Sequence, residues 1–487
     1  MFRRDPRWLR YRGPLALLVL STLLLNVSCS VNPATGKQQL AFYSEAEEIQ
    51  LGLESDKEIV ASVGLYDDPE LQAYVEGLGK SLAARSERPN LPWSFKVVDD
   101  PAVNAFALPG GYIYVTRGLL SHMGSEAELS GVIGHEIGHV TARHGINQAS
   151  KQMLAMIGLG AVALIDEDLA QLAGAASVGL GLLFLKYGRD DERQADDLGL
   201  RYMTRAGYDP REMAGVFSVL QGVQTAEGGG RLPSWLSTHP DPGARHDRIE
   251  KVVAELPGDY STATVNEDGY LRQIDGIVFG DNPREGYFQG NAFVHPDMRF
   301  RVEFPAGWET SNEKASVSAS APSEDAVLQV SLAEASSPQA AAEAFFEEEG
   351  LSQEDSWDKA VHGLPATWSR FEYEDAESKL SGTVAFVKHN GNVFQLLAIT
   401  TPEQWENNRR SLEASLASFS RLDDPKALNA KPRRLHLVKL PREMTLEEFD
   451  KKYPSAIKME LLALINHAQP GERLPAGTLV KRVVEDS

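Results

Sequence analysis

The chain has 487 residues and a formal net charge of −21 at neutral pH. This length exceeds what one hydrophobic core usually organises, so we expect two to three folded units. An acidic chain repels phosphate backbones, and the sequence has no long basic run beyond its N-terminus. We therefore expect no nucleic-acid partner.

The N-terminus has the pattern of an export signal. Arginines crowd the first 12 residues, and the apolar run over residues 15–25 is too short to cross a bilayer comfortably. The single cysteine, Cys29, follows in a context similar to a bacterial lipobox, although Asn26 stands where a Leu is usual. We expect a signal peptide over residues 1–29 and export to the periplasm, with a lipid anchor at Cys29 on the outer membrane. Cleavage near Ser28, or retention of the run as a short anchor, is the alternative.

Helix and strand patterns alternate over residues 30–256. Ser44 and Glu47 form a capping pair before an apolar periodic run, which predicts a helix start, and helical spacing continues over 71–82. Residues 93–97 alternate as a strand does. The second member of this strand pair lies around 104–116, with a turn or bulge at Pro109 to Gly111.

A second capping pair, Ser125 and Glu128, opens another predicted helix. Two apolar stretches follow, over 153–165 and 169–185, which we interpret as a helical hairpin packed in the core, with bilayer contact as the alternative. A further helix is expected over 190–206.

The pattern of the second half differs. After a connecting segment, 257–289, we expect an α+β accessory domain over 290–423 and a small unit over 435–485. Strands are predicted over 300–304, 327–332, 384–387 and 393–399, and helices over 340–346 and 404–419.

His135, Glu136 and His139 form the pattern HExxH, which places two imidazoles one helical turn apart on the same face. Catalytic zinc takes three protein ligands and a water, and a carboxylate beside that water can accept its proton. The pattern also occurs by chance in helices whose histidines face solvent. A third ligand is therefore needed to distinguish a zinc site from a chance occurrence of the pattern.

Glu192 is the candidate third ligand. An astacin-like or matrixin-like extension would need Gly and His where the chain has Ala142 and Gly145, so that class is excluded. Glu192 and Asp196 lie four residues apart, on one face of a later helix. If that face is turned toward the first helix, Glu192 completes the site, and Asp196 accepts a hydrogen bond from the outer nitrogen of a ligating histidine. An ordinary acidic surface helix is the alternative.

These segments resemble the HtpX-like and CAAX-prenyl-protease-like zinc metallopeptidases, of the gluzincin kind, over about residues 30–250. The resemblance implies an endopeptidase with one Zn²⁺ per chain. The matching segments are Asn32 to Gly36, Ser44 to Glu48, Asn104 to Ala107, Pro109 to Gly111, His135 to His144, Glu192 to Asp196, and Ser237 to Pro240.

The resemblance also implies how substrate is held and cleaved. A strand around Asn104 and Ala105 would pair with an extended peptide, an ordinary sheet edge being the alternative. Zinc would polarise water and the scissile carbonyl, while Glu136 takes the water proton and passes it to the leaving amine.

His239 and Arg245 are candidates for stabilising the oxyanion, because a loop after the catalytic helices can fold over the cleft. The family places an Arg six positions after the His, which selects Arg245, and an Ile directly behind that Arg, which selects Arg248. The family also offers His239 a second role, as an extra zinc ligand that displaces the water and keeps the enzyme idle. A polar loop is the alternative for all three. His144, five residues past His139, is predicted to lie at the surface or to cap the helix.

The fold class that we predict is α+β: a mainly helical zincin-type peptidase domain with a small sheet, the accessory domain, and a C-terminal unit that resembles a LysM domain. A LysM domain implies peptidoglycan as a partner, although the usual Gly-Asp before Thr445 is missing.

The predicted function is a zinc endopeptidase of the bacterial envelope that hydrolyses unfolded or misassembled envelope proteins, because edge-strand binding suits unfolded chains. The alternative is a non-hydrolytic assembly or peptidoglycan-binding factor with a structural zinc site. Glu136 favours the enzyme, since a structural site needs no carboxylate beside an open metal position.

Overall fold

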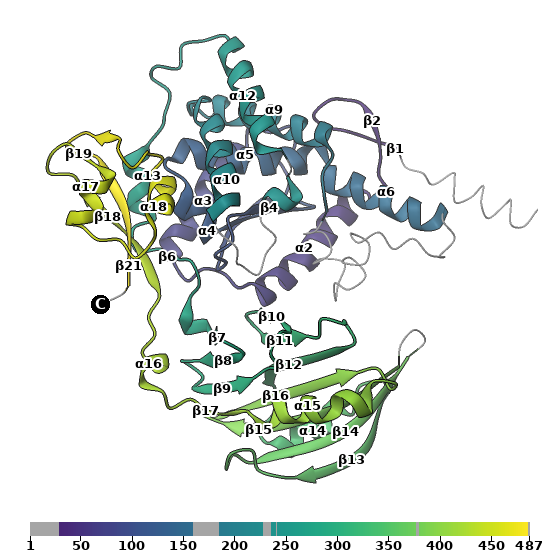
Figure 1. Ribbon diagram of the computed structural model, residues 1–487. Coiled ribbons are helices and arrows are strands. Elements are labelled where there is room, and N and C mark those ends of the chain that lie inside the picture. The colour runs from purple at the N-terminus through teal and green to yellow at the C-terminus, as the bar shows by residue number, and fades with distance from the viewer. Residues whose placement is uncertain (1–28, 159–184, 227–234, 240, 376–378, 486–487) are drawn as a thin grey trace, which may run out of the picture. The chain divides into compact units, whose positions relative to one another are not determined.

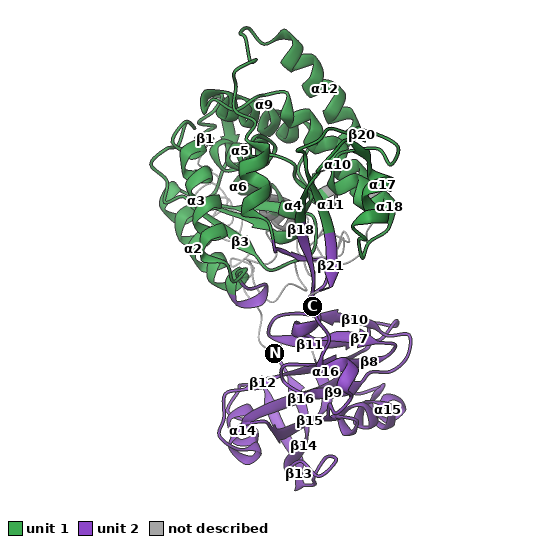
Figure 2. Ribbon diagram, turned by 90° about the vertical axis from the view of Figure 1, so that its left-hand side faces the viewer, with its two compact units in different colours: residues 1–60, 65–275, 437–482 green, residues 61–64, 276–436, 483–487 purple. Residues whose placement is uncertain are grey.

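The computed structural model describes residues 29–158, 185–226, 235–239, 241–375 and 379–485 (Figure 1). The chain divides into two compact units (Figure 2): unit 1 over residues 1–60, 65–275 and 437–482, and unit 2 over 61–64, 276–436 and 483–487. The predicted export signal and most of the predicted hairpin lie outside the described residues. Among those described, no helix has the length and apolar character needed to cross a membrane.

Unit 1 is mainly helical with small sheets. Its N-terminal part contains β1 (Cys29–Val31), β2 (Gln38–Leu40), α2 (Glu45–Ser62), α3 (Pro69–Ala83), β3 (Ser94–Val98), β4 (Ala105–Leu108), β5 (Tyr112–Thr116), α4 (Arg117–His122), α5 (Glu126–Ala142) and α6 (His144–Gly158). Then follow α9 (Arg189–Arg205), α10 (Glu212–Ala226), α11 (Trp235–Thr238), α12 (Pro242–Glu255) and α13 (Glu267–Gln273). The C-terminal part contains β18 (Arg433–Lys439), β19 (Met444–Thr445), α17 (Leu446–Lys452), α18 (Met459–Ile465), β20 (Arg473–Leu474) and β21 (Leu479–Glu485).

Both predicted helix starts are confirmed. Ser44 and Glu47 cap α2 reciprocally, since the Ser44 amide donates to the Glu47 carboxylate over 2.8 Å and the Glu47 amide donates to Ser44 Oγ over 3.3 Å. At α5, Ser125 Oγ accepts from the Glu128 amide over 3.1 Å. The Glu128 carboxylate instead accepts from the amide of Gly124, so only half of that capping box forms.

The small sheet has the strand order β3-β5-β4. Residues 104–116 are two strands joined by a tight turn rather than one bulged strand, because Gly110 and Gly111 take φ values of +82° and +106° that favour glycine. The central strand β5 pairs in parallel with β3 and antiparallel with β4. This order leaves β4 at an edge of the described sheet.

Helices α5 and α9 pack closely against each other (Figure 1). Small residues line the crossing, Gly134 and Gly138 on α5 facing Ala195 and Gly199 on α9. A Cβ added at Gly199 would lie 2.8 Å from the backbone nitrogen of His135, closer than real Cβ contacts. The absence of side chains at these positions therefore sets the distance between the helix of the HExxH pattern and the helix of Glu192.

We expect Gly199→Ala to lower the free energy of unfolding by about 1–3 kcal/mol, because the added methyl group meets backbone that must shift. Gly77→Ala in α3 is the matched control, since a Cβ there meets nothing within 4 Å. The control should be neutral or stabilising by up to about 1 kcal/mol, because Ala favours helix over Gly. Thermal unfolding of both variants measures the difference. Equal stability of the two would contradict the close approach.

The C-terminal residues 437–482 form part of unit 1, and α18 packs against α10 and α4. The buried Lys481 donates from Nζ to the carbonyl oxygens of Met123, over 2.5 Å, and Ser121, over 3.3 Å. His467 Nε2 donates to the carbonyl of His122 over 2.8 Å, and His467 Nδ1 lies 3.2 Å from Glu128 Oε1. Two basic side chains of this segment therefore bind the chain directly before and at the start of α5.

The ion pair of His467 and Glu128 predicts a pH-dependent stability. Burial lowers the pKa of His467, but the Glu128 carboxylate raises it more, so the net shift is upward. A raised folded-state pKa stabilises the fold below the unfolded value, about 6.5, and this contribution is lost as pH rises through the raised pKa.

We therefore expect His467→Gln to lower the free energy of unfolding by about 1–3 kcal/mol near pH 6 and by less near pH 9. The other groups around the pair are Lys481, Glu212, Glu267 and His122, and they are present in both proteins. Chemical unfolding at both pH values measures the effect, with His246→Gln on α12 as the control. A penalty that grows with pH would refute this assignment.

Unit 2 is an α+β structure. It contains β6 (Val278–Phe279), the 3₁₀ helix η3 (Pro283–Glu285), β7 (Tyr287–Gln289), β8 (Ala292–His295), β9 (Phe300–Glu303), β10 (Glu309–Asn312), β11 (Ser316–Ser320), β12 (Ala326–Ala333), α14 (Pro338–Phe345), β13 (Leu351–Asp358), β14 (Ala366–Glu374), β15 (Lys379–His389), β16 (Asn392–Thr400), α15 (Trp405–Ala417), β17 (Ser420–Arg421) and α16 (Pro425–Leu428). All four predicted strands and both predicted helices of this region are confirmed. The unit begins at residue 276, whereas the sequence suggested 290.

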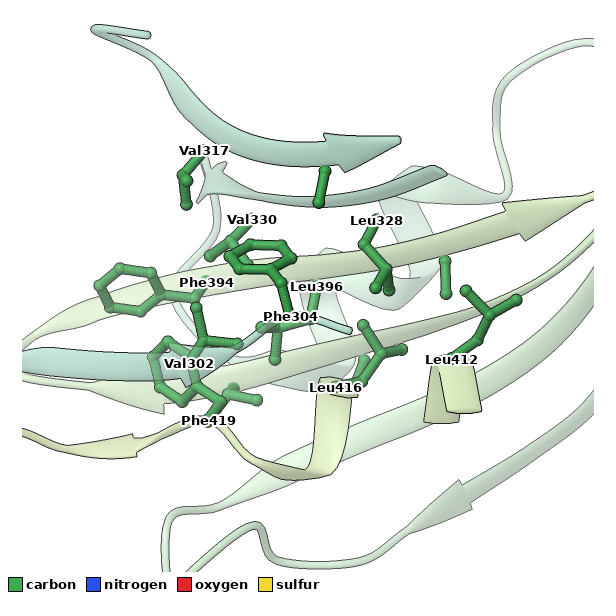
Figure 3. Close-up of a cluster of buried hydrophobic side chains, with 14 of the residues drawn as sticks. Val302, Phe304, Val317, Leu328, Val330, Phe394, Leu396, Leu412, Leu416 and Phe419 are labelled. Atoms are coloured by element: carbon green, nitrogen blue, oxygen red, sulfur yellow. The ribbon is translucent and has the colours of Figure 1, made fainter. Parts of the chain in front are cut away.

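Two sheets and two helices form the core of unit 2. The larger sheet has the order β10-β11-β12-β16-β15-β14-β13, and the smaller one β17-β9-β8-β7. Val302 of the smaller sheet and Phe304, just after β9, pack in one cluster with Leu396 of the larger sheet and Leu412 of α15 (Figure 3). Helix α14 packs on the opposite face, against Val384 and Phe386.

Candidate active site

Four helices of unit 1, α5, α9, α11 and α12, bring the predicted site residues together. Helix α5 carries His135, Glu136 and His139, and α9 carries Glu192 and Asp196. His239 follows the short helix α11, and Arg245 lies in α12. All of these side chains are buried.

The four candidate ligands converge on one point. One ligand atom from each of His135, His139, Glu192 and His239 lies within 4.8 Å of the others. His139 Nε2 lies 3.0 Å from His135 Nε2 and 3.3 Å from Glu192 Oε1. Zn–N distances near 2.0–2.1 Å in a tetrahedral site separate two ligand atoms by about 3.3 Å, so this donor set fits zinc.

Asp196 fixes the orientation of His135. Its Oδ1 lies 3.0 Å from His135 Nδ1, and because a carboxylate only accepts, Nδ1 carries the proton and Nε2 keeps its lone pair for a metal. Burial raises the pKa of Asp196, but Arg245 and His135 lower it more, and the net shift is downward. Asp196 is therefore ionised although it is fully buried.

Glu136 lies beside the ligands, with Oε1 3.8 Å from Nε2 of His239. Within the described part of the chain, its buried Oε1 has no hydrogen-bond partner, and a buried polar atom of this kind calls for a water or an ion. A water bound to a metal at the ligand cluster would satisfy it. Burial raises the pKa of Glu136 to about 8, and a cation at the ligands would oppose this shift.

The structure separates the two candidate arginines. Arg245 is buried, with Nη1 2.7 Å from Glu192 Oε2 and Nε donating to Asp196 Oδ2 over 3.1 Å. Its guanidinium lies 4.5 Å from the ring centres of both Phe217 and Trp235. Arg248 is partly exposed and pairs with Asp197. Arg245 is thus the arginine at the site.

His239 lies among the ligands. Its Nδ1 is 3.3 Å from His135 Nε2 and 2.9 Å from Glu192 Oε1. Its ring stacks on Trp235 with a centroid separation of 4.6 Å, which holds the ring toward the cluster. His239 therefore offers a fourth possible ligand atom in the cluster.

The predicted substrate strand is β4, which packs against α5. Asn104 and Ala105 are buried at its start, and the Asn104 amide donates to Thr116 Oγ1 over 3.1 Å. Ala107 is the partly exposed residue of this strand and, with Pro109, His139 and Tyr187, lines a small cavity. The accessible part of the edge therefore lies closer to Ala107 than to the two predicted residues.

His144 was predicted wrongly. It is 2% exposed, and its Nδ1 lies 3.1 Å from Nδ1 of His139. The helical offset of five residues does not apply, because α5 ends at Ala142 and Arg143 takes a left-handed φ of 60° that redirects the chain. Sequence reasoning also missed Tyr187 and Trp235, whose rings lie 4.0 Å from His139 and 5.5 Å from His135. No local pattern marks either aromatic residue.

An HExxH helix, completed by a glutamate from a second helix and with an unpaired carboxylate beside the ligands, defines a zinc-metallopeptidase type of site. Comparison with known protein families indicates the same type of site. Residues 69–253 match the model of Peptidase family M48, so this region is similar to that family of zinc metallopeptidases.

Curated relatives match the same region. The chain is 38% identical over 175 residues to "Mitochondrial metalloendopeptidase OMA1" of Arabidopsis thaliana, covering 36% of this chain and 34% of the relative. It is 33% identical to "Putative beta-barrel assembly-enhancing protease" of Vibrio cholerae, over 38% of each chain. It is 29% identical to "Beta-barrel assembly-enhancing protease" of Escherichia coli, over 45% of this chain and 46% of the relative. The chain thus matches less than half the length of each of these relatives.

Proposed function

We propose that this protein is a zinc-dependent endopeptidase of the bacterial cell envelope. The observation that carries the proposal is the convergence of His135, His139 and Glu192 on one point, with the unpaired Glu136 carboxylate oxygen beside them. A purely structural zinc site has no use for such a carboxylate.

The chain's own residues have distinct tasks in this reaction. Zinc held by His135, His139 and Glu192 would supply Lewis-acid activation of a water and of the scissile carbonyl. Glu136 accepts the proton of the attacking water and delivers it to the leaving amine. Asp196 keeps His135 in the tautomer that binds metal, as its 3.0 Å contact supports.

Arg245 and His239 complete the proposed mechanism. Arg245 orients Glu192 and Asp196, and its positive charge lies near enough to favour an oxyanion as that charge develops. His239 Nδ1 lies 3.3 Å from His135 Nε2 and 2.9 Å from Glu192 Oε1, so it would take the place of the water on a metal held there, and hydrolysis would require its ring to move away. The arrangement seen would then be an idle form of the enzyme.

Substrates would bind as extended chains along the edge strand β4. Main-chain pairing gives affinity with little side-chain selectivity, which suits unfolded or misassembled envelope proteins. Two relatives are named for enhancing β-barrel assembly, which supports an envelope role. The location that we propose is the periplasm, with a lipid anchor at Cys29 on the outer membrane.

The C-terminal residues 435–485 have a strand, two helices and a closing strand in the order expected of a LysM-like unit. Peptidoglycan is therefore a further proposed partner. A failed pull-down of the protein on purified peptidoglycan would remove this partner from the proposal.

The test is cleavage of an unfolded model protein by the purified, zinc-loaded chain, followed by removal of zinc with a chelator. We expect cleavage that stops on chelation and returns when zinc is added back. Persistent absence of cleavage, including by a His239→Ala variant that cannot block the metal, would favour the non-hydrolytic alternative.

A further inference from the structure

A run of polar contacts leads from the metal ligand His139 to the N-terminal turn of the described chain. His139 Nδ1 lies 3.1 Å from His144 Nδ1, and His144 Nε2 lies 2.9 Å from Gln194 Oε1. The same Gln194 oxygen accepts a hydrogen bond from Asn32 Nδ2 over 3.2 Å. Asn32, His139 and His144 are each buried.

The turn at residues 32–37 fixes which way Asn32 points. The side-chain oxygen Oδ1 accepts from the backbone amides of Ala34, over 2.9 Å, and Thr35, over 3.3 Å. The backbone N–H of Asn32 donates to the carbonyl of Lys37 over 2.8 Å. Since the oxygen is used by the turn, the NH₂ group is the end that faces Gln194. The Gln194 atom that faces Asn32 must therefore be its acceptor oxygen.

The direction of every further contact follows from this. Because the Gln194 oxygen only accepts, His144 must carry its proton on Nε2, which leaves Nδ1 of His144 as an acceptor. His139 then donates from Nδ1 to His144 Nδ1, and its Nε2 keeps a lone pair. That lone pair faces His135 Nε2 and Glu192 Oε1, the other ligand atoms.

We propose that Asn32, Gln194 and His144 are positioning residues that set the tautomer and ring orientation of the zinc ligand His139. The inference rests on the proposed zinc site, and it gives His139 a counterpart to what Asp196 does for His135. A second candidate acceptor for His144, Asp191, lies 3.7 Å from Nε2, too far for a hydrogen bond.

The segment just after Cys29 takes part in this positioning. Asn32 lies three residues beyond that cysteine, in the loop between β1 and β2. The two strands pair with each other, and the loop between them reaches α9 through the contact of Asn32 with Gln194. The proposed zinc site is therefore linked to the turn between β1 and β2.

The first experiment measures the zinc dissociation constant of the purified protein by competition with a chelating dye, together with kcat and KM. We expect His144→Leu to weaken zinc binding about 10–100-fold, as loss of a ligand's hydrogen-bond partner does. His144→Asn keeps an acceptor oxygen near the position of Nδ1, so it should restore most of the affinity. Equal affinity of His144→Leu and the parent would overturn the proposal.

The second experiment separates positioning from folding at Asn32. Asn32→Asp keeps the oxygen that the turn needs but loses the donor, so the Gln194 amide is expected to turn and present NH₂ to both neighbours. His144 would then have to carry its proton on Nδ1, facing the proton of His139. Asn32→Ala breaks the turn but leaves the Gln194 oxygen free to accept from His144.

If Asn32 acted only through folding, the less stable variant would also bind zinc more weakly. We expect the opposite: Asn32→Asp weakens zinc binding more than Asn32→Ala, while Asn32→Ala has the lower unfolding temperature. Arg193→Ala, an exposed neighbour of Gln194, is the control and should match the parent in both. If zinc affinity follows the unfolding temperature instead, the proposal is wrong. These affinities are informative whether or not the parent cleaves a substrate, so failure of the proposed peptidase activity is a separate result.

Discussion

Glu136→Gln is expected to lower kcat by at least about 100-fold and up to about 10⁴-fold, the range that a positioned general base contributes. The amide has the shape of the carboxylate but cannot accept the proton of the attacking water. Zinc binding should persist, because Glu136 is not one of the converging ligands. The measurement is cleavage of an unfolded protein at saturating zinc, together with the zinc dissociation constant.

The control for this substitution is Glu255→Gln, at the exposed end of α12, which removes the same charge away from the site. It should leave kcat unchanged. A Glu136→Gln protein that cleaves as fast as the control would show that another group activates the water, and the proposed mechanism would have to be abandoned.

Glu192→Gln is expected to weaken zinc binding by more than about 100-fold, beyond the loss typical of a partner that only touches a ligand. The neutral amide is a poorer ligand, and Arg245 loses its 2.7 Å ion pair with the carboxylate. Since a ligand that binds only the folded state stabilises it, zinc should raise the unfolding temperature of the parent and of Glu136→Gln but not of Glu192→Gln.

Asp197→Asn is the matched control for Glu192→Gln. Asp197 lies on the same helix, half exposed and paired with Arg248, and its loss should not alter the response to zinc. If Glu192→Gln shows the same zinc-dependent rise in unfolding temperature as this control, then His239 or another group is the third ligand.

The ligand set illustrates how far local patterns reach. His135 and His139 are found from sequence because one helical turn joins them, and Glu192 and Asp196 because four residues separate them on a helix. The same helical reasoning failed for His144. Arg143 takes a left-handed φ that ends the helix, so helical spacing no longer predicts the position of a residue after it.

The accessory region shows a similar division. Its predicted strands carry buried apolar side chains, which alternate with more exposed residues in β9, β12 and β16 and run continuously over Val384 to Val387 in β15. Both patterns are strong local signals. Strand β13 (Leu351–Asp358) is polar and almost wholly exposed at the edge of the larger sheet, so it gives no such signal. β13 is a strand because it pairs with β14, and its own sequence pattern does not predict this.

The candidate ligands can be read from the sequence: two imidazoles and one carboxylate at helical spacing, with Glu192 and Asp196 on a later helix. How these groups meet depends on the fold. Glycines at the crossing of α5 and α9 bring Glu192 to the histidines. Asn32 contacts Gln194, which lies 162 residues further along the chain and in turn contacts His144. The physical reason is that helical periodicity is a local property, whereas close helix approach and hydrogen-bond direction depend on which distant segments the fold places side by side.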